Sequence, residues 1–594
     1  MASLSFFSCS VLQYKNYHNI TRKIDIHKPI YPSKSTSDIV TAKATAVVQP
    51  FARRSANYAP TLWTFDHIQS LSSEYTGEYY KARANSLKDT VKKMLVSKVG
   101  DPLSSLELVD DLQRLGISYH FQEEIRNLLE MIYCSYYKPH DQWDNLGLNL
   151  KALGFRLLRQ HGFQVPQEIF HNFKSKIQNL KPQELLENTI GMLNLYEASY
   201  HSLEEESLLD DARDFSATFL KENQDRFDEN ISSLVSHALE FPLHWRVPRI
   251  EAKWFIHAYE KRSDMNPILL ELSKLDFDMV QAVHIEDLKH ASRWWSNTRW
   301  DSKLSFSRDR VVVNFLWTIG FGYLPQYTLG RRTLAKVNSM ITTIDDVYDV
   351  YGNLDELEQF TRVIERWDIN AAEELPDYMK ICFLGFHNTV NEIAYDTMAD
   401  TGFFILPYLK KAWADLCNAY LVEARWYYGG YQPTLKEYLD NGWVSISGPV
   451  ILMNATFLTS VGTTNEVFQC MEGLEKIVHY SSRILRLADD LGTSEDEMVK
   501  GDISKSIQCY MHESGATEEE ARMHIKELIL ETWKKLNKER ARANSQFSRE
   551  FVEYATNVAR TAQFIYSEGD GHGRPDIIQS HISALLFNPI QRTI

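Results

Sequence analysis

The stretch that says most about this chain is Thr342-Thr343-Ile344-Asp345-Asp346-Val347-Tyr348-Asp349, which places three carboxylates inside an otherwise apolar helical pattern. Asp345 and Asp349 stand four residues apart, so on an α-helix they share one face. Two unpaired carboxylates on a face that should be buried are costly unless a cation lies between them. Oxygen ligands at this spacing suit Mg²⁺ or Mn²⁺, which usually hold substrate phosphates as well. By itself, the stretch is equally compatible with a solvated acidic face.

A second acidic stretch begins at Asp489, about 140 residues downstream. Asp489, Thr493 and Glu497 follow one another at intervals of four, so their oxygens line one helix face. A hydroxyl between two carboxylates is a suitable ligand set for a hard cation. Alone, this pattern also fits an ordinary acidic helix end. Paired with the first stretch, it predicts two facing helices that hold several divalent ions around one diphosphate.

Three basic residues are placed to complete such a site. Arg308 precedes the first acidic stretch, Arg486 lies one helical turn before Asp489, and Lys505 follows the second stretch. Arginine forks suit bidentate phosphate contacts, whereas lysine serves as a point charge. Taken singly, each would be interpreted as a surface base.

Length and charge narrow the class of protein. A chain of 594 residues exceeds the size at which single cores stop growing, so more than one domain is expected. Its formal net charge of −15 argues against nucleic-acid binding, which calls for a basic surface. An acidic protein that binds a phosphate ester needs metal ions as bridges. The six cysteines include no CxxC pair, so neither a disulfide framework nor a zinc site is indicated.

Helical periodicity dominates from about residue 65 onward, which predicts an all-α protein. The polar segment 261–267 ends in proline and is the best linker candidate. It separates an N-terminal helical domain at 53–267 from a C-terminal helical domain at 268–594, which carries the chemical signals. The uncharged segment 441–465 is interrupted by polar residues and by Gly448-Pro449, so we expect a broken buried helix and no stable membrane insertion.

Residues 1–52 differ from the rest because they are rich in serine and contain only two acidic residues. This bias is typical of a plastid or mitochondrial transit peptide, and the alternative is a plain disordered tail.

Four motifs together resemble those of the plant terpene synthases, specifically the monoterpene synthase group. They are Arg53-Arg54 followed by eight residues and Trp63, Arg308-Asp309-Arg310, Asp345-Asp346-Val347-Tyr348-Asp349, and the Asp489/Thr493/Glu497 set with Arg486. The resemblance extends from Arg53 to the C-terminus. It implies a class I terpene cyclase bundle that carries the active site and an N-terminal α-barrel-like domain without one. It also implies a prenyl diphosphate substrate and three Mg²⁺ or Mn²⁺ ions per active site.

The resemblance also implies roles for individual residues. Asp345 and Asp349 would bind one side of the metal cluster, and Asp489, Thr493 and Glu497 would bind the remaining ion. On a helix Asp346 points about 100° away from Asp345, so we expect it to support the two ligands and not to bind the ions itself. Arg308, Arg486 and Lys505 would hold the diphosphate. Trp317 and Tyr566 match aromatic positions that line the family's cavity, where π-faces stabilise a carbocation. Tyr348 and Phe457 are further aromatic candidates, and core packing is the alternative for each. Asn338 lies on the same helix before Asp345 and would line the same cavity beside the substrate. No general base is obvious, and Tyr566, Asp570, His572 or diphosphate itself could accept the final proton.

The leader and the Arg53-Arg54 pair indicate a plastid enzyme that uses geranyl diphosphate and releases a C10 olefin or alcohol. In the family, the arginine pair is associated with isomerisation before ring closure, which slightly favours a cyclic product. The same sequence from Arg53 to Tyr58 also occurs in relatives with acyclic products. Two other interpretations stay open: a sesquiterpene or hemiterpene synthase using farnesyl or dimethylallyl diphosphate, and a non-catalytic helical scaffold. We expect a monomer or a weak homodimer.

Overall fold

Helices make up all of the regular secondary structure in the residues that the computed structural model describes, so the all-α prediction is confirmed. These residues are 58–97, 100–172, 186–459, 464–500, 503–543 and 548–590, without side chains at 141–142, 459, 464–475, 495–500 and 543. The predicted transit segment 1–52 and the Arg53-Arg54 pair lie outside the described residues.

The α-helices of the N-terminal part are α1 (Phe65–Ser70), α2 (Glu78–Ser97), α3 (Pro102–Arg114), α4 (Gln122–Ile132), α5 (Leu148–Gln160), α8 (Thr189–Ser199), α9 (Ser207–Glu222), α10 (Glu229–Glu240) and α11 (Pro248–Glu260). Those of the C-terminal part are α12 (Pro267–Thr298), α13 (Trp300–Lys303), α14 (Val311–Phe321), α15 (Thr328–Asp346), α16 (Leu354–Arg366), α17 (Asp377–Thr401), α18 (Leu406–Gly429), α19 (Leu435–Ser445), α20 (Gly448–Thr459), α21 (Thr464–Lys500), α22 (Ser506–Ser514), α23 (Glu518–Ala543), α24 (Arg549–Ile565) and α25 (Gln579–Ile582). Three π-helical turns are η2 (Tyr133–Tyr137), η8 (Val347–Tyr351) and η10 (Ser583–Phe587). The 3₁₀ turns are η1 (Ser118–His120), η3 (His140–Asn145), η4 (Gln167–Phe170), η5 (Gln224–Arg226), η6 (Leu243–Trp245), η7 (Pro325–Tyr327) and η9 (Ile369–Glu374).

The predicted linker ends where the long helix α12 begins. Asn266 caps this helix, because its side-chain oxygen accepts hydrogen bonds from the backbone N–H groups of Ile268 and Leu269 at 2.9 and 3.4 Å. Pro267 occupies the first helical turn, where its missing N–H costs nothing. Helix α12 packs against α1 and α2 and also against α14 and α15. Because Arg53–Ile594 clusters as a single compact unit, the domain division near residue 267 stays a prediction.

The chain breaks between α19 and α20, close to the predicted Gly448-Pro449 position. Ser447 adopts φ 69°, which turns the backbone before α20 begins at Gly448. A Cβ atom at Gly448 would lie 2.1 Å from the hydroxyl oxygen of Ser482, so the close approach of α20 to α21 requires glycine. Among the described helices, none combines the length and apolar character needed to cross a membrane.

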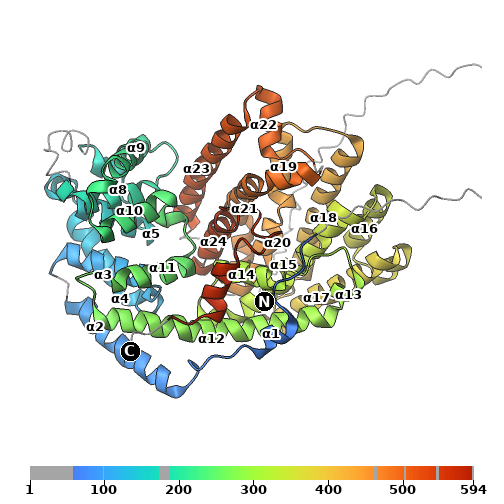
Figure 1. Cartoon of the computed structure of the whole chain (residues 1–594), viewed down its shortest axis with the longest axis horizontal. Coiled ribbons are helices and arrows are strands. Elements are labelled where there is room, and N and C mark those ends of the chain that lie inside the picture. Colours follow the sequence, from blue (N-terminus) through green and yellow to red (C-terminus); the bar gives the residue numbers. More distant parts are fainter. Residues whose placement is uncertain are drawn as a thin grey trace, which may run out of the picture. The chain divides into compact units, whose positions relative to one another are not determined.

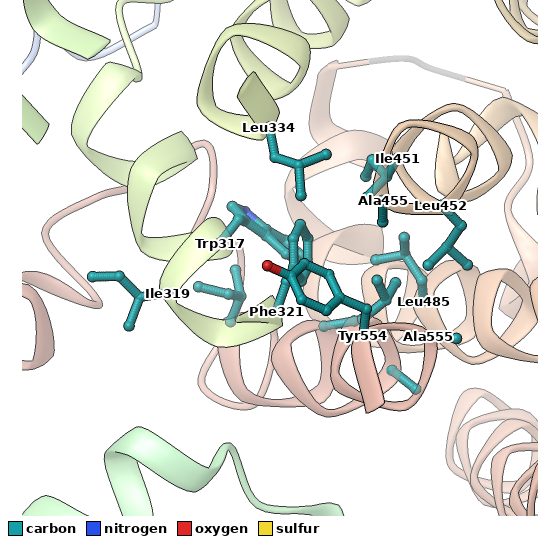
Figure 2. Close-up of a cluster of buried hydrophobic side chains, with 14 of the residues drawn as sticks. Trp317, Ile319, Phe321, Leu334, Ile451, Leu452, Ala455, Leu485, Tyr554 and Ala555 are labelled. Carbon is teal, nitrogen blue, oxygen red and sulfur yellow. The ribbon is translucent and has the colours of Figure 1, made fainter. Parts of the chain in front are cut away.

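The core of the C-terminal part forms where five helices meet: α14, α15, α20, α21 and α24 (Figure 1). Figure 2 shows buried apolar side chains from all five converging, among them Trp317, Leu334, Ile451, Leu485 and Tyr554. Burying large apolar side chains contributes roughly 1.5–3 kcal/mol each, which holds the helices in place. Trp317, Ile451 and Leu485 also line the cavity described next, so the core forms one wall of the site.

Candidate active site

The first acidic stretch lies where α15 ends at Asp346 and continues as the π-helical turn η8. The sequence prediction assumed an α-helix throughout. A π-turn holds more residues than an α-turn, so the simple four-residue spacing does not apply across it. Asp345 and Asp349 nevertheless line one cavity of about 140 Å³. Such π-turns are often found at functional sites.

Asp346 supports the cavity from behind, as its offset on the helix predicts. Its side chain is fully buried, and one carboxylate oxygen accepts the backbone N–H of Arg308 at 2.8 Å. The other lies 2.9 Å from the Nε atom of Arg308. Burial raises the pKa of Asp346 to about 6, even though the guanidinium of Arg308 opposes this shift. Asp346 therefore fixes both the backbone and the side chain of Arg308.

Arg308 faces the cavity with its guanidinium already paired. Its Nη2 atom donates to an Asp345 carboxylate oxygen at 2.6 Å. The ring of Tyr58 lies over the guanidinium at 4.5 Å from the ring centroid, within cation–π range. Tyr58 was not predicted as a site residue, since nothing in its local sequence connects it with residue 308.

The second acidic stretch lies on α21 and faces the same cavity. Asp489 and Thr493 both line it, and the Thr493 hydroxyl is buried without a hydrogen-bond partner in the described structure. Glu497 belongs to the same helix, but its side chain is outside the described part. Arg486 also lines the cavity and donates to an Asp489 carboxylate oxygen at 3.0 Å. This pairing is the counterpart of Arg308 with Asp345.

Asp490 on α21 is a buried supporting carboxylate, as Asp346 is on α15. It is fully buried and accepts a hydrogen bond from the Tyr438 hydroxyl at 2.7 Å. Its other oxygen accepts the backbone N–H of Ser506 at 3.3 Å, immediately after Lys505. Lys505 lines the cavity. The second aspartate of each pair thus anchors the backbone that carries a cavity cation.

The donor set fits hard divalent ions. Every predicted ligand supplies oxygen, which Mg²⁺ and Mn²⁺ prefer, and the unpartnered Thr493 hydroxyl faces the cavity. Among the described residues, no three His, Cys, Asp or Glu side chains lie close enough together to hold an ion by themselves. The carboxylates instead form two groups that line the same cavity, one at the end of α15 and in η8, the other on α21. This arrangement suits ions that complete their coordination with substrate phosphate oxygens and water.

The remaining wall is aromatic and polar. Trp317 and Tyr566 both line the cavity, with ring centroids 6.0 Å apart. Trp317 donates its indole N–H to Nδ1 of His572 at 3.3 Å. Burial, reinforced by Arg308 and Arg310, holds the pKa of His572 well below its usual range, so the ring is neutral. Asn338 also lines the cavity.

Two aromatic candidates lie elsewhere. Tyr348 packs against Phe360 and Tyr420, and its hydroxyl lies 2.7 Å from that of Thr361. Phe457 packs against Phe403 and Tyr408. Neither lines the cavity, so core packing explains both.

Glu423 on α18 is a cavity residue that the sequence did not reveal. It is buried and accepts hydrogen bonds from Ser445 at 2.6 Å and from Asn441 at 3.0 Å. A lone glutamate in a helical pattern carries no spacing signal.

Volume alone does not identify the site. A larger cavity of about 1380 Å³ lies between α10 and α11 on one side and α23 and α24 on the other. Leu491 and Tyr566 line it, but none of the predicted metal ligands or diphosphate-binding bases does.

Known protein families match both halves of the chain. Residues 296–535 match the metal binding domain of the terpene synthase family, and residues 62–239 match the terpene synthase N-terminal domain. An R-linalool synthase of Artemisia annua, named as chloroplastic, is 64% identical over 563 residues, which cover 95% of this chain and 99% of that one.

Two solved structures are similar throughout. A limonene synthase with 2-fluorolinalyl diphosphate has a TM-score of 0.87 and 45% identity, covering 91% of this chain and 100% of that one. The isoprene synthase of grey poplar, in complex with three Mg²⁺ ions and dimethylallyl-S-thiolodiphosphate, has a TM-score of 0.81 and 43% identity, covering 90% and 100%.

Proposed function

This chain belongs to the terpene synthase family, and we propose that it converts geranyl diphosphate into a monoterpene, with linalool as its main product. It is therefore a lyase that breaks a carbon–oxygen bond. The observation that carries the proposal is one cavity lined by two groups of oxygen ligands, three basic side chains and an aromatic wall. The identity of 64% to an R-linalool synthase supports an acyclic alcohol over the cyclic product that Arg53-Arg54 alone favoured.

We place the enzyme in the chloroplast, in keeping with its relatives and with the composition of residues 1–52. The expected monomer or weak homodimer stays a prediction.

Three divalent ions would be held by Asp345 and Asp349 on one wall and by Asp489, Thr493 and Glu497 on the other. The isoprene synthase complex, which holds three Mg²⁺ ions, supports this number. When bound, the ions supply Lewis acidity at the leaving diphosphate oxygens.

Arg308, Arg486 and Lys505 neutralise the charge that develops on diphosphate as the allylic carbon–oxygen bond breaks. Preorganised charges of this kind usually make the largest contribution to catalysis. Arg308 is held by Asp346, and the Lys505 segment is held by Asp490, so neither has to reorganise far during the reaction.

The cation that remains needs a dry wall with electron-rich faces. Trp317 and Tyr566 offer such faces, and a desolvated cation–π contact contributes roughly 2 kcal/mol. Asn338 donates its side-chain N–H to the carbonyl of Asn314 at 3.2 Å, whereas its own side-chain oxygen is buried without a partner in the described structure. We propose that this oxygen accepts a hydrogen bond from the water that attacks the cation. The carbon–oxygen bond then forms while the water loses a proton to the released diphosphate, which leaves the neutral alcohol.

The test is product analysis. The protein from Arg53 onward is incubated with Mg²⁺ and geranyl, farnesyl or dimethylallyl diphosphate, and volatiles are identified by chiral gas chromatography. We expect C10 products from geranyl diphosphate only, with linalool the most abundant. A cyclic main product would refute the product assignment, and volatiles from the other substrates alone would refute the substrate assignment. No volatile from any substrate would favour the non-catalytic scaffold.

A further inference from the structure

A further cavity, here called the arginine-lined cavity, lies between α4 and α5 on one side and α23 and α24 on the other. Its lining is far less acidic than that of the candidate active site. Its volume is about 280 Å³, and it shares no lining residue with the candidate active site. Four arginines line it: Arg126, Arg159, Arg540 and Arg549. The one carboxylate on its described lining is Glu553. In a chain with a net charge of −15, this concentration of positive charge needs an explanation.

The guanidinium of Arg159 is fully hydrogen-bonded within the protein. It donates to both carboxylate oxygens of Glu206 at 2.6 Å and to the backbone carbonyls of Val165 and His201. It therefore contributes charge to the cavity but no free donor.

Arg540 is incompletely satisfied. Its side chain is about nine-tenths buried, and its Nη2 atom donates to a Glu553 oxygen at 3.1 Å. Its Nε atom is buried without a hydrogen-bond partner in the described structure. A buried guanidinium donor without a partner costs free energy, which a ligand in the cavity would recover.

Arg126 and Arg549 lie exposed at the mouth of the cavity. Within the described structure, neither has a carboxylate oxygen within 4 Å, although Arg549 approaches Nδ1 of His161 at 3.4 Å. Their forks remain available to a ligand entering from solvent.

The electrostatics of the cavity agree with this geometry. Burial opposes ionisation of Glu553, yet Arg540, Arg560 and Arg549 lower its pKa to about 2. Burial, with Arg540 next in importance, holds the pKa of His201 well below its usual range, so this histidine adds no charge. Arg159 is paired with Glu206, and Arg540 shares Glu553 with Arg560, so the charges of Arg126 and Arg549 are left without a paired carboxylate in the described structure.

We propose that this cavity binds a small phosphoryl anion, inorganic diphosphate or phosphate, between Arg540 inside and Arg126 and Arg549 at the mouth. Guanidinium forks match phosphoryl oxygens in bidentate geometry. Diphosphate binds more tightly than phosphate, because its two groups reach the inner and outer arginines at once. The bound anion bridges α4 and α24, which lie far apart in the sequence.

The test is isothermal titration of the whole chain with inorganic diphosphate, and separately with phosphate, in metal-free buffer. In Arg126→Gln/Arg549→Gln, two exposed side chains change, so the fold is retained. Each lost charge-assisted contact weakens binding by about tenfold or more, so we expect a loss of about a hundredfold in the double variant. The matched control is Arg366→Gln/Arg425→Gln, which removes the same charge from exposed positions elsewhere and leaves binding unchanged.

Arg308→Gln separates this cavity from the active site. Diphosphate binding at the arginine-lined cavity survives this substitution. Equal titration curves for the double variant and its control would overturn the proposal. So would loss of all diphosphate binding in Arg308→Gln, or the absence of binding of either anion to the unmodified chain.

Discussion

Replacing Asp490 by asparagine tests the idea that the second aspartate of each pair positions a cation. Asp490 is fully buried and accepts hydrogen bonds from Tyr438 at 2.7 Å and from the backbone N–H of Ser506 at 3.3 Å. It also lies 3.5 Å from Arg486. Asparagine keeps the shape and one acceptor, but it turns an NH₂ group toward either Ser506 or Tyr438. One hydrogen bond to a charged acceptor is therefore lost.

The size of the effect follows from that single bond. A hydrogen bond to a charged group contributes about 1.5–3 kcal/mol. Arg486 retains Asp489 at 3.0 Å, so it is not left without a carboxylate. If the loss falls on the segment that carries Lys505, kcat/KM for geranyl diphosphate decreases by about 10- to 150-fold. The helical circular dichroism should be preserved.

The assay is steady-state kinetics at several Mg²⁺ concentrations. Asp490→Asn should lower kcat/KM at saturating Mg²⁺ and leave the half-saturating Mg²⁺ concentration nearly unchanged. Asp489→Asn, which alters a predicted ligand, should instead raise that concentration. Asp440→Asn is the control, because this aspartate is exposed and pairs only with Lys436 in the described structure. A kcat/KM for Asp490→Asn within twofold of the unmodified enzyme, or equal Mg²⁺ shifts in both variants, would refute the reasoning.

Three further predictions concern the metal ligands, the fold and the cavity wall. Asp345→Ala and Asp489→Ala should each lower kcat by at least about a hundredfold with the helical circular dichroism intact; near-normal turnover in either would contradict a shared metal cluster. Asp210→Ala serves as their control, since the ion pair of this partly exposed aspartate with Lys534 on α23 contributes about 0–1 kcal/mol. Burial holds the pKa of His284 well below its usual range, so the unfolded chain binds a proton below about pH 6.5 that the folded chain does not. Stability is therefore lost as the pH falls below that value, by up to ~1.4 kcal/mol per pH unit for this group, and urea unfolding should show a shallower pH dependence in His284→Gln. Trp317→Leu should lower kcat by about thirtyfold if a cation–π contact of roughly 2 kcal/mol is lost, whereas Trp317→Phe should lose much less; equal rates for the two variants would exclude that contact.

Local spacing predicted part of the candidate site. The interval of four placed Asp489 with Thr493 on α21, and both line the cavity. Asp345 and Asp349 line the same cavity, but a π-helical turn lies between them, so the α-helical interval is not what brings them together. The polar segment 261–267 was predicted as a linker, and the structure, which describes this whole segment, has no helix between Glu260 and Pro267. The cap that Asn266 provides for α12 was not predicted, although an asparagine followed by proline has a local physical reason to begin a helix.

Features that depend on long-range pairing could not be predicted in this way. The offset of Asp346 on its helix indicated a supporting role, but not that it holds the backbone N–H of Arg308. Glu423 enters the cavity through its contacts with Ser445 and Asn441 on another helix. The arginine-lined cavity brings together residues 126 and 549, which no local pattern connects.

The paired cations on both walls imply that metal binding and substrate binding are coupled. Arg308 pairs with Asp345 at 2.6 Å and Arg486 pairs with Asp489 at 3.0 Å, so each guanidinium is bonded to a carboxylate that is a predicted metal ligand. Were these carboxylates to hold a divalent ion instead, the guanidiniums would be free to face diphosphate, with Arg308 still positioned by Asp346. Coupling of this kind is reciprocal, so the half-saturating Mg²⁺ concentration should fall as geranyl diphosphate rises.

Arg486→Gln should weaken that dependence. Glutamine can still accept or donate a hydrogen bond, but it no longer competes with an ion for the Asp489 carboxylate as a full charge does. Kinetics over a grid of Mg²⁺ and substrate concentrations give the coupling directly. If the variant showed the same dependence as the unmodified enzyme, exchange of guanidinium for metal at Asp489 would not be the source of the coupling. Bridging of the ions by the substrate phosphates would then suffice.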